Sequence, residues 1–136
     1  MSKITTHILN TANGRPAENV LVTLYQVRGS APDGEIEIAS ARTSKDGRIT
    51  DWQGEADSTG NGPADGEKGR ERMRVAGLSL GTGIYKLRFE TKDYFDRQAA
   101  ASLYPFVDIY FEMTGDGHYH IPLLISPFGY STYRGS

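Results

Sequence analysis

Short strand-like runs of residues, separated by turn-forming residues, constrain this chain more than any other feature of its sequence. Sixteen glycines and six prolines interrupt it, and few apolar residues recur at helical spacing. The clearest of the expected strands are residues 4–9, 20–27, 35–43, 83–90, 107–113 and 118–125. Thr91–Gln98 is the stretch expected as a short helix, with Thr91 as its N-cap. This spacing predicts an all-β fold, an antiparallel β-sandwich of about seven or eight strands with one short helix.

The length, composition and charge of the chain limit its number of domains and the kinds of partner and chemistry expected of it. A chain of 136 residues is expected to form a single domain, 1–136, whose core needs no disulfide or metal. No cysteine is present, so thiol chemistry is excluded. The net charge of −2 argues against nucleic acid or an anionic membrane as a partner, and no apolar run approaches a membrane span. We expect a soluble protein of the cytoplasm or the peroxisome.

One stretch, at about 53–77, departs from the strand pattern. Glycine and charged residues fill it, and apolar residues are almost absent before Val75. A segment of this composition buries too little surface to offset the entropy cost of ordering it. Loops of this length in compact domains are usually functional or disordered. We therefore expect a flexible surface insertion there.

The last twenty residues, Gly117–Ser136, concentrate the side chains that can do chemistry. His118 and His120 are two residues apart, so an extended strand places both on one face, roughly 6 to 7 Å apart. Pro122 cannot donate a ladder hydrogen bond, which predicts an edge, a bulge or a break in pairing at this strand. Two surface histidines on an ordinary edge strand would give the same pattern.

The third histidine and one arginine are candidates for the same site. His7 lies on the first expected strand, and the chain has three histidines in all. Arg48 follows directly on the tight turn that the pair Asp46-Gly47 predicts. A solvated arginine beside Asp46 is the alternative interpretation of that spacing. The tail residues expected within reach of the histidines are Tyr133, Arg134 and Ser136 with its terminal carboxylate.

Several of these motifs occur together in one known family. They are Thr6-His-Ile-Leu9, Gly14-Arg-Pro-Ala17, Lys45-Asp-Gly-Arg48, Tyr94-Phe95, Tyr104-Pro105, His118-Tyr-His-Ile-Pro-Leu-Leu124 and the terminal Tyr133-Arg-Gly-Ser136. With them the chain resembles the 5-hydroxyisourate hydrolases, transthyretin-like enzymes of urate breakdown, everywhere except in the loop at about 53–77. The resemblance implies a transthyretin-like β-sandwich of two four-stranded sheets. It also implies a homotetramer whose central channel holds active sites shared between subunits.

The resemblance further implies a role for each candidate side chain. By position, the expected catalytic residues are His7, Arg48, His120 and Ser136, and the expected substrate-binding residues are His7, Arg48, His118, Tyr133, Arg134 and Gly135. The implied reaction converts 5-hydroxyisourate to 2-oxo-4-hydroxy-4-carboxy-5-ureidoimidazoline, by water attack and ring opening at a cyclic amide, without cofactor or metal. A neutral imidazole, of His7 or of His120, suits the proton transfers. The planar guanidinium of Arg48 suits a flat, anionic purine derivative.

Two other functions remain open at this point. A small-molecule carrier of the transthyretin type would use the same channel without chemistry, and the fold alone does not separate carrier from hydrolase. Three histidines, two of them in a His-x-His pair, also match the way proteins hold zinc with an open position. The arginine and tyrosines expected nearby suit an organic anion better than a metal.

Overall fold

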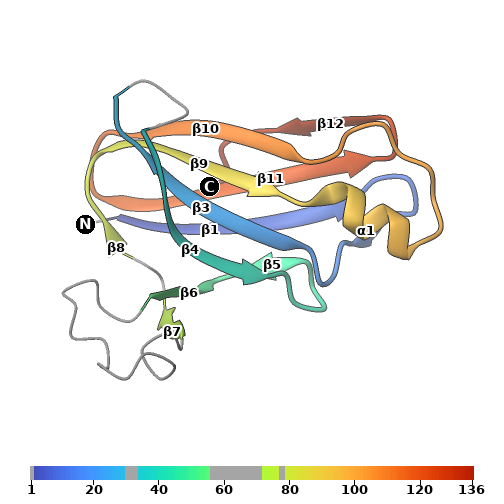
Figure 1. Ribbon diagram of the computed structural model, residues 1–136, viewed down its shortest axis with the longest axis horizontal. Coiled ribbons are helices and arrows are strands. Elements are labelled where there is room, and N and C mark those ends of the chain that lie inside the picture. The colour runs from blue at the N-terminus through green and yellow to red at the C-terminus, as the bar shows by residue number, and fades with distance from the viewer. Residues whose placement is uncertain (1, 30–33, 56–71, 77–78) are drawn as a thin grey trace.

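Two β-sheets and one short helix make up the described part of the chain (Figure 1). The computed structural model describes residues 2–29, 34–55, 72–76 and 79–136. The predicted all-β sandwich with one helix is confirmed, although each sheet has six strands among these residues rather than four. The elements in chain order are β1 (Ser2–Asn10), β2 (Arg15–Pro16), β3 (Leu21–Val27), β4 (Glu35–Arg42), β5 (Arg48–Ile49), β6 (Asp51–Glu55), β7 (Arg72–Ala76), β8 (Ser79–Leu80), β9 (Gly83–Phe89), α1 (Thr91–Arg97), β10 (Val107–Met113), β11 (Gly117–Ser126) and β12 (Gly129–Thr132).

The first long strand and the last long strand of the chain lie side by side in the first sheet. β1 pairs with β11 in parallel, from Ser2 opposite Gly117 to Asn10 opposite Ile125, and β12 pairs with the other side of β11. The predicted antiparallel pairing of the sandwich is therefore wrong at this pair. Strands adjacent in sequence usually pair as hairpins, whereas all the strands of the second sheet lie between β1 and β11 in the chain.

Three short segments share the other edge of β1. β8 pairs with the start of β1, β5 with its middle and β2 with its end. Each segment is two residues long, so together they extend the sheet without forming a continuous strand. The pairing of β5 places Arg48 directly opposite His7.

The second sheet runs in the order β10-β9-β3-β4-β6-β7. Its last two strands, β6 and β7, form an antiparallel pair from Asp51 opposite Ala76 to Glu55 opposite Arg72. The predicted insertion at 53–77 is therefore too wide at both ends, because residues 53–55 and 72–76 belong to strands. Charged residues and glycine concealed the strand pattern there. Residues 56–71 and 77 lie outside the described residues.

Apolar side chains of the two sheets meet between them and form the core. From the central strands it includes Ile4, Ile8, Ile121, Leu123 and Ile125 on the first sheet, and Val22, Leu24, Tyr85, Leu87 and Phe89 on the second. The indole N–H of Trp52 donates to the carbonyl of Ile4 at 2.9 Å, which ties β6 to the first sheet. Because strand residues alternate between faces, Thr5 and His7 of β1 and His118 and His120 of β11 project away from the core.

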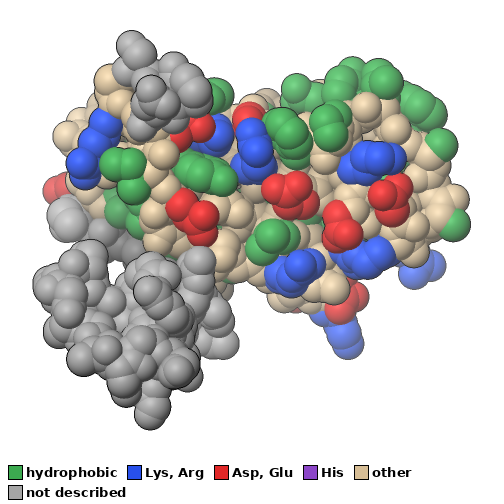
Figure 2. All heavy atoms as spheres, in the orientation of Figure 1, with side chains coloured by type: hydrophobic (Ala, Val, Ile, Leu, Met, Phe, Trp, Pro, Cys, Tyr) green, Lys and Arg blue, Asp and Glu red, His purple; other side chains and the backbone are tan. Residues whose placement is uncertain are grey.

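Charged side chains pair with one another on the outer face of the second sheet. Lys86, only 3 % exposed, places its Nζ 2.6 Å from a carboxylate oxygen of Glu35 and 4.3 Å from the ring centroid of Tyr25. Arg88 donates two hydrogen bonds to Asp108, at 2.8 and 2.9 Å. Figure 2 shows acidic and basic side chains interspersed on the face in view, and no described histidine is visible on it.

The N-cap residue of helix α1 lies one position before the predicted Thr91. Glu90 is the N-cap residue and makes no side-chain capping hydrogen bond. Thr91 is not the cap, because its side chain is buried, with Oγ1 lacking a hydrogen-bond partner. Asp93 in the first turn and Arg97 in the last turn suit the helix dipole. Within the described chain, no helix has the length and apolar character needed to cross a membrane.

Candidate active site

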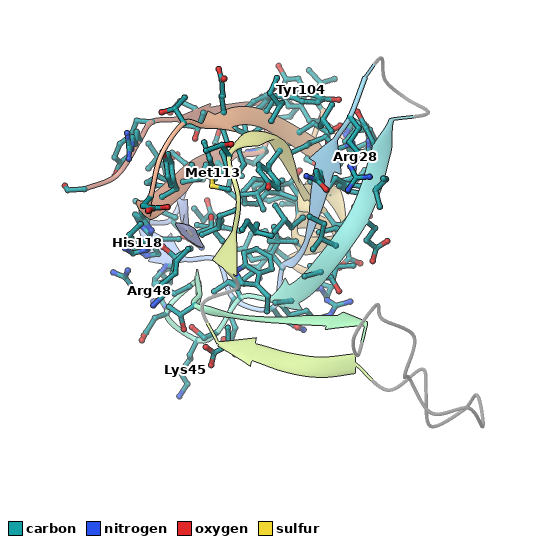
Figure 3. The ribbon with its side chains drawn as sticks, turned by 90° about the vertical axis from the view of Figure 1, so that its left-hand side faces the viewer. Arg28, Lys45, Arg48, Tyr104, Met113 and His118 are labelled. Carbon is teal, nitrogen blue, oxygen red and sulfur yellow. The ribbon has the colours of Figure 1, made fainter. Side chains whose placement is uncertain are left out.

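The outward face of the first sheet carries the three histidines. His7 follows Thr5 on this face of β1, and His120 follows His118 on the same face of β11. β5 adds Arg48 beside His7. Figure 3 shows Arg48 and His118 on the same side of the molecule. The predicted histidine face therefore also receives the predicted arginine.

A hollow of about 200 Å³ opens on this face. His118 and Arg48 at its rim are exposed to solvent, whereas Thr5 is buried and His120 is half-buried. Pockets for drug-sized ligands have volumes of about 300–1,000 Å³, so this hollow suits a small ligand. Its lining residues are Thr5, Thr6, Arg48, Thr50, His118, His120 and Ser136.

The turn before Arg48 is fixed against β1. Gly47 has a φ of 74°, in a region that glycine enters without strain. Its N–H donates to the carbonyl of Ser44 and its carbonyl accepts from the N–H of Ile8, both at 2.8 Å. A Cβ on Gly47 would lie 2.5 Å from the carbonyl oxygen of Ile8. The predicted Asp46-Gly47 turn is therefore confirmed, and its close contact with β1 delivers Arg48 to the site.

Burial and neighbouring positive charge lower the pKa of two histidines. For His120, burial is the largest cause, followed by the electrostatic effects of His118, Arg48 and His7. For His7, burial again comes first and Arg48 second, while Asp46 opposes them. Both imidazoles are therefore predominantly neutral at pH 7 and able to accept a proton. His7 lies beside the hollow, and His120 lines it.

Thr5 joins the two histidines of β11. Its Oγ1 lies 2.7 Å from Nε2 of His118 and 2.7 Å from Nδ1 of His120. The parallel register places Thr5 directly opposite His120. Sequence reasoning missed this residue, because threonine is common in strands of every kind and its relation to His120 depends on the register.

The tail is held against β11 by two contacts. The N–H of Gly135 donates to the carbonyl of His120 at 2.8 Å, in an isolated β-bridge. The guanidinium of Arg134 lies 4.4 Å from the ring centroid of Tyr119, a buried residue on the opposite face of β11. Consecutive tail residues therefore contact the two faces of one strand.

These contacts divide the predicted tail residues into two groups. Ser136 lines the hollow, and Gly135 is paired with His120 at its edge. Tyr133 is 57 % exposed, and Arg134 lies over Tyr119. Neither of these two is among the described residues that line the hollow.

Pairing along β11 changes at Pro122, as its missing N–H predicts. β12 pairs with β11 from Leu123 to Ser126. Between Gly117 and Pro122, β1 is the strand partner among the described residues, and the bridge at His120 is the contact on the other side. The break leaves the histidine half of β11 accessible from the tail side.

The histidines are not arranged as a metal centre in the described part of the chain. No group of three or more His, Cys, Asp or Glu side chains there is placed to hold a metal ion. The ring nitrogens of His118 and His120 instead share the hydroxyl of Thr5. The chemistry that this arrangement supports is proton transfer next to a guanidinium.

Comparison with known proteins gives a consistent result over nearly the whole chain. The HIUase/Transthyretin family matches residues 4–135. The 5-hydroxyisourate hydrolase of Deinococcus radiodurans is 41 % identical, over 98 % of this chain and 95 % of that protein. The structure of Klebsiella pneumoniae 5-hydroxyisourate hydrolase superposes with a TM-score of 0.70 at 30 % identity, over 98 % of this chain and 99 % of that one.

A thyroxine-binding protein shares the fold. Sea bream transthyretin, solved in complex with thyroxine, superposes with a TM-score of 0.70 at 24 % identity, over 98 % of this chain and 94 % of that one. This likeness concerns the fold alone, so the choice between hydrolase and carrier depends on the site residues.

Proposed function

Because the chain belongs to the HIUase/Transthyretin family, we propose that it hydrolyses 5-hydroxyisourate to 2-oxo-4-hydroxy-4-carboxy-5-ureidoimidazoline in the breakdown of urate. The observation that carries the proposal is the presence of a neutral imidazole, His120, and a guanidinium, Arg48, in one hollow. Hydrolysis of a cyclic amide needs a base for the attacking water and positive charge near the developing oxyanion. A carrier needs neither.

We assign the proton transfers to His120. Its Nδ1 is engaged by Thr5, which leaves Nε2 to act on water. As the water oxygen bonds to the ring carbonyl carbon, Nε2 takes a proton. The ring C–N bond then breaks, and the same proton passes to the leaving nitrogen, so that His120 ends the cycle neutral.

The other residues hold the substrate in this assignment. Arg48, charged at every physiological pH, donates paired hydrogen bonds to the oxygens of the flat substrate. His7, in register with Arg48, adds a neutral imidazole on that side of the site. The hydroxyl of Ser136 orients the water or the substrate, and His118 and Gly135 complete the wall.

We also propose that the protein is a homotetramer in which the site is completed by a second copy. Exposed aromatic side chains on and beside the outer strand β12 support this: Phe128 is 67 %, Tyr130 46 % and Tyr133 57 % exposed. β12 is also an unpaired sheet edge among the described strands, and such edges invite pairing. Light scattering on the purified protein tests the proposal, and a fully active monomer would refute it.

The proposed activity is tested on freshly generated 5-hydroxyisourate, whose ring opening is followed by its absorbance. The wild-type protein should accelerate the decay, and His120→Asn should lower the turnover rate by roughly 10²- to 10⁴-fold. Arg48→Ala should weaken both binding and turnover, whereas Arg42→Ala, another exposed arginine that bonds to Asn19, serves as the matched control. A carrier would bind the compound and leave the spontaneous rate unchanged.

A further inference from the structure

The hydroxyl of Thr5 contacts two histidines but can donate a hydrogen bond to only one of them. Thr5 is only 6 % exposed, and its Oγ1 is within hydrogen-bonding distance of one ring nitrogen of His118 and one of His120. A hydroxyl donates one hydrogen bond and accepts others. When both imidazoles are neutral, Thr5 satisfies both contacts by donating to one nitrogen and accepting from the other.

This rule couples the tautomers of the two histidines. If Nδ1 of His120 carries a proton and donates to Thr5, then Thr5 donates to a bare Nε2 of His118. In that arrangement Nε2 of His120 is bare and able to act as the base. If the proton sits instead on Nε2 of His118, Thr5 donates to Nδ1 of His120, and His120 carries its proton on Nε2 as an acid. The first form becomes the second when two protons shift through Thr5, from Nδ1 of His120 to Thr5 and from Thr5 to Nε2 of His118, while Nε2 of His120 gains a proton and Nδ1 of His118 releases one to water.

We propose that Thr5 relays a proton between His120 and His118, so that His118 stores the charge that His120 acquires during hydrolysis. The relay rests on the proposed function. When Nε2 of His120 takes the proton of the attacking water, its Nδ1 proton passes to Thr5 while the proton of Thr5 passes to Nε2 of His118. When the leaving nitrogen takes the Nε2 proton of His120, both transfers reverse. No proton is gained or lost over the cycle.

The surroundings favour moving the charge in this direction. His120 is half-buried and next to Arg48, whereas His118 is exposed to water, which stabilises an imidazolium. The other charged or titratable groups facing the pair are His7 and Lys3 on β1, with Lys3 in register with His118, and the terminal carboxylate of Ser136, which lines the same hollow. Arg134 lies over Tyr119, on the other face of β11. Storage on His118 removes the positive charge from the side chain closest to substrate chemistry.

The relay makes Thr5 a positioning residue that acts through His120. Thr5→Val removes the hydroxyl with little change of shape, and Thr5→Ser keeps it. We expect Thr5→Val to lower kcat by about 10- to 100-fold with little change in KM, and Thr5→Ser to stay within a few-fold of wild type. Thr23→Val, at a buried threonine on β3 in the second sheet, is the control and should be without effect.

Two measurements distinguish a relay from a structural role. Ring ¹⁵N shifts of the free protein should show protonated Nδ1 on His120 with a bare Nε2 on His118, and Thr5→Val should abolish this complementary pattern. A proton inventory in mixtures of H₂O and D₂O should be curved for wild type and Thr5→Ser, because several protons move together, and linear for Thr5→Val.

The outcomes separate the relay from the function on which it rests. A wild-type protein that does not accelerate ring opening refutes the proposed function, while the ¹⁵N shifts still decide whether Thr5 couples the histidines. Unchanged tautomers in Thr5→Val, or equal damage from Thr5→Ser and Thr5→Val, overturns the relay. Folding of each variant is checked by circular dichroism. If Thr5→Val unfolds, His118→Asn replaces it and should show the same linear inventory.

Discussion

Gly135 is the residue whose substitution tests the site geometry most directly. A Cβ added there would press against Cδ2 of His120 and lie 3.1 Å from its Cγ and 3.3 Å from its Cβ. Carbon atoms in contact are normally about 3.5 to 4.0 Å apart. In Gly135→Ala, either the imidazole or the tail must therefore move by about 1 Å. The hydrogen bond from residue 135 to the carbonyl of His120 favours displacement of the ring, because the backbone N–H remains.

The expected loss follows from that displacement. Misplacing a catalytic group by about 1 Å lowers the rate by roughly 10²-fold, which corresponds to about 2.7 kcal/mol of transition-state stabilisation. Stability should change by less than about 0.5 kcal/mol, since Arg134 and Ser136 on either side are exposed and no core contact is removed. We therefore expect Gly135→Ala to lose activity while it keeps nearly the stability of the wild-type protein.

The assay is ring opening of 5-hydroxyisourate, with urea unfolding measured on the same preparations. Gly115→Ala is the control, because a Cβ there meets no atom within 4 Å and the residue does not have a positive φ. Full activity in Gly135→Ala would show that the contact between tail and imidazole is irrelevant to catalysis. A large loss of stability would show that the tail is part of the folding core instead.

Three further predictions concern the tail, pH and a buried hydroxyl. A short Gly-Ser extension after Ser136 should lower activity at least about tenfold without shifting the unfolding midpoint, because Ser136 lines the hollow but is exposed; normal activity would exclude the tail from the mechanism. The lowered pKa values of His7 and His120 mean that the unfolded chain binds more protons than the folded chain below pH 6.5, so the free energy of unfolding should rise with pH up to about 6.5 and then level off. Urea titrations at several pH values should show a shallower rise in the double variant His7→Asn, His120→Asn. Thr91→Val should raise the free energy of unfolding by about 1 kcal/mol, because the buried Oγ1 has no partner, and a decrease would reveal a hydrogen bond to buried water.

The strands and their buried faces could be predicted because alternation is a local property. Tyr119, Ile121 and Leu123 are buried on β11 as the pattern predicts, and His118 and His120 share the opposite face. The turn at Gly47 could also be predicted, because Asp-Gly pairs favour its backbone conformation. These features depend on a few neighbouring residues.

The rest depends on register and burial, which local patterns do not contain. The parallel pairing of β1 with β11 brings Thr5 between two histidines more than a hundred residues away. Arg134 was grouped with the site by its place in the terminal motif, but the structure places it over Tyr119. Thr91 matched a capping residue in type, yet its side chain is buried. In each case the sequence indicates the kind of residue, and tertiary contacts decide its partner.

The parallel pairing of β1 and β11 also determines when the site can exist during folding. The two hydrogen bonds of Thr5 join residues 113 and 115 positions apart. Contacts between residues so distant in sequence form slowly, because the entropy of closing the intervening loop is lost before they stabilise the chain. The described pairings in the second sheet span at most 67 positions, from Val22 to Phe89 (89 − 22 = 67), so that sheet can assemble while the histidine face is still absent. Catalysis therefore reports on the completion of folding, and a partly folded chain is expected to be inactive even when most of its sandwich has formed.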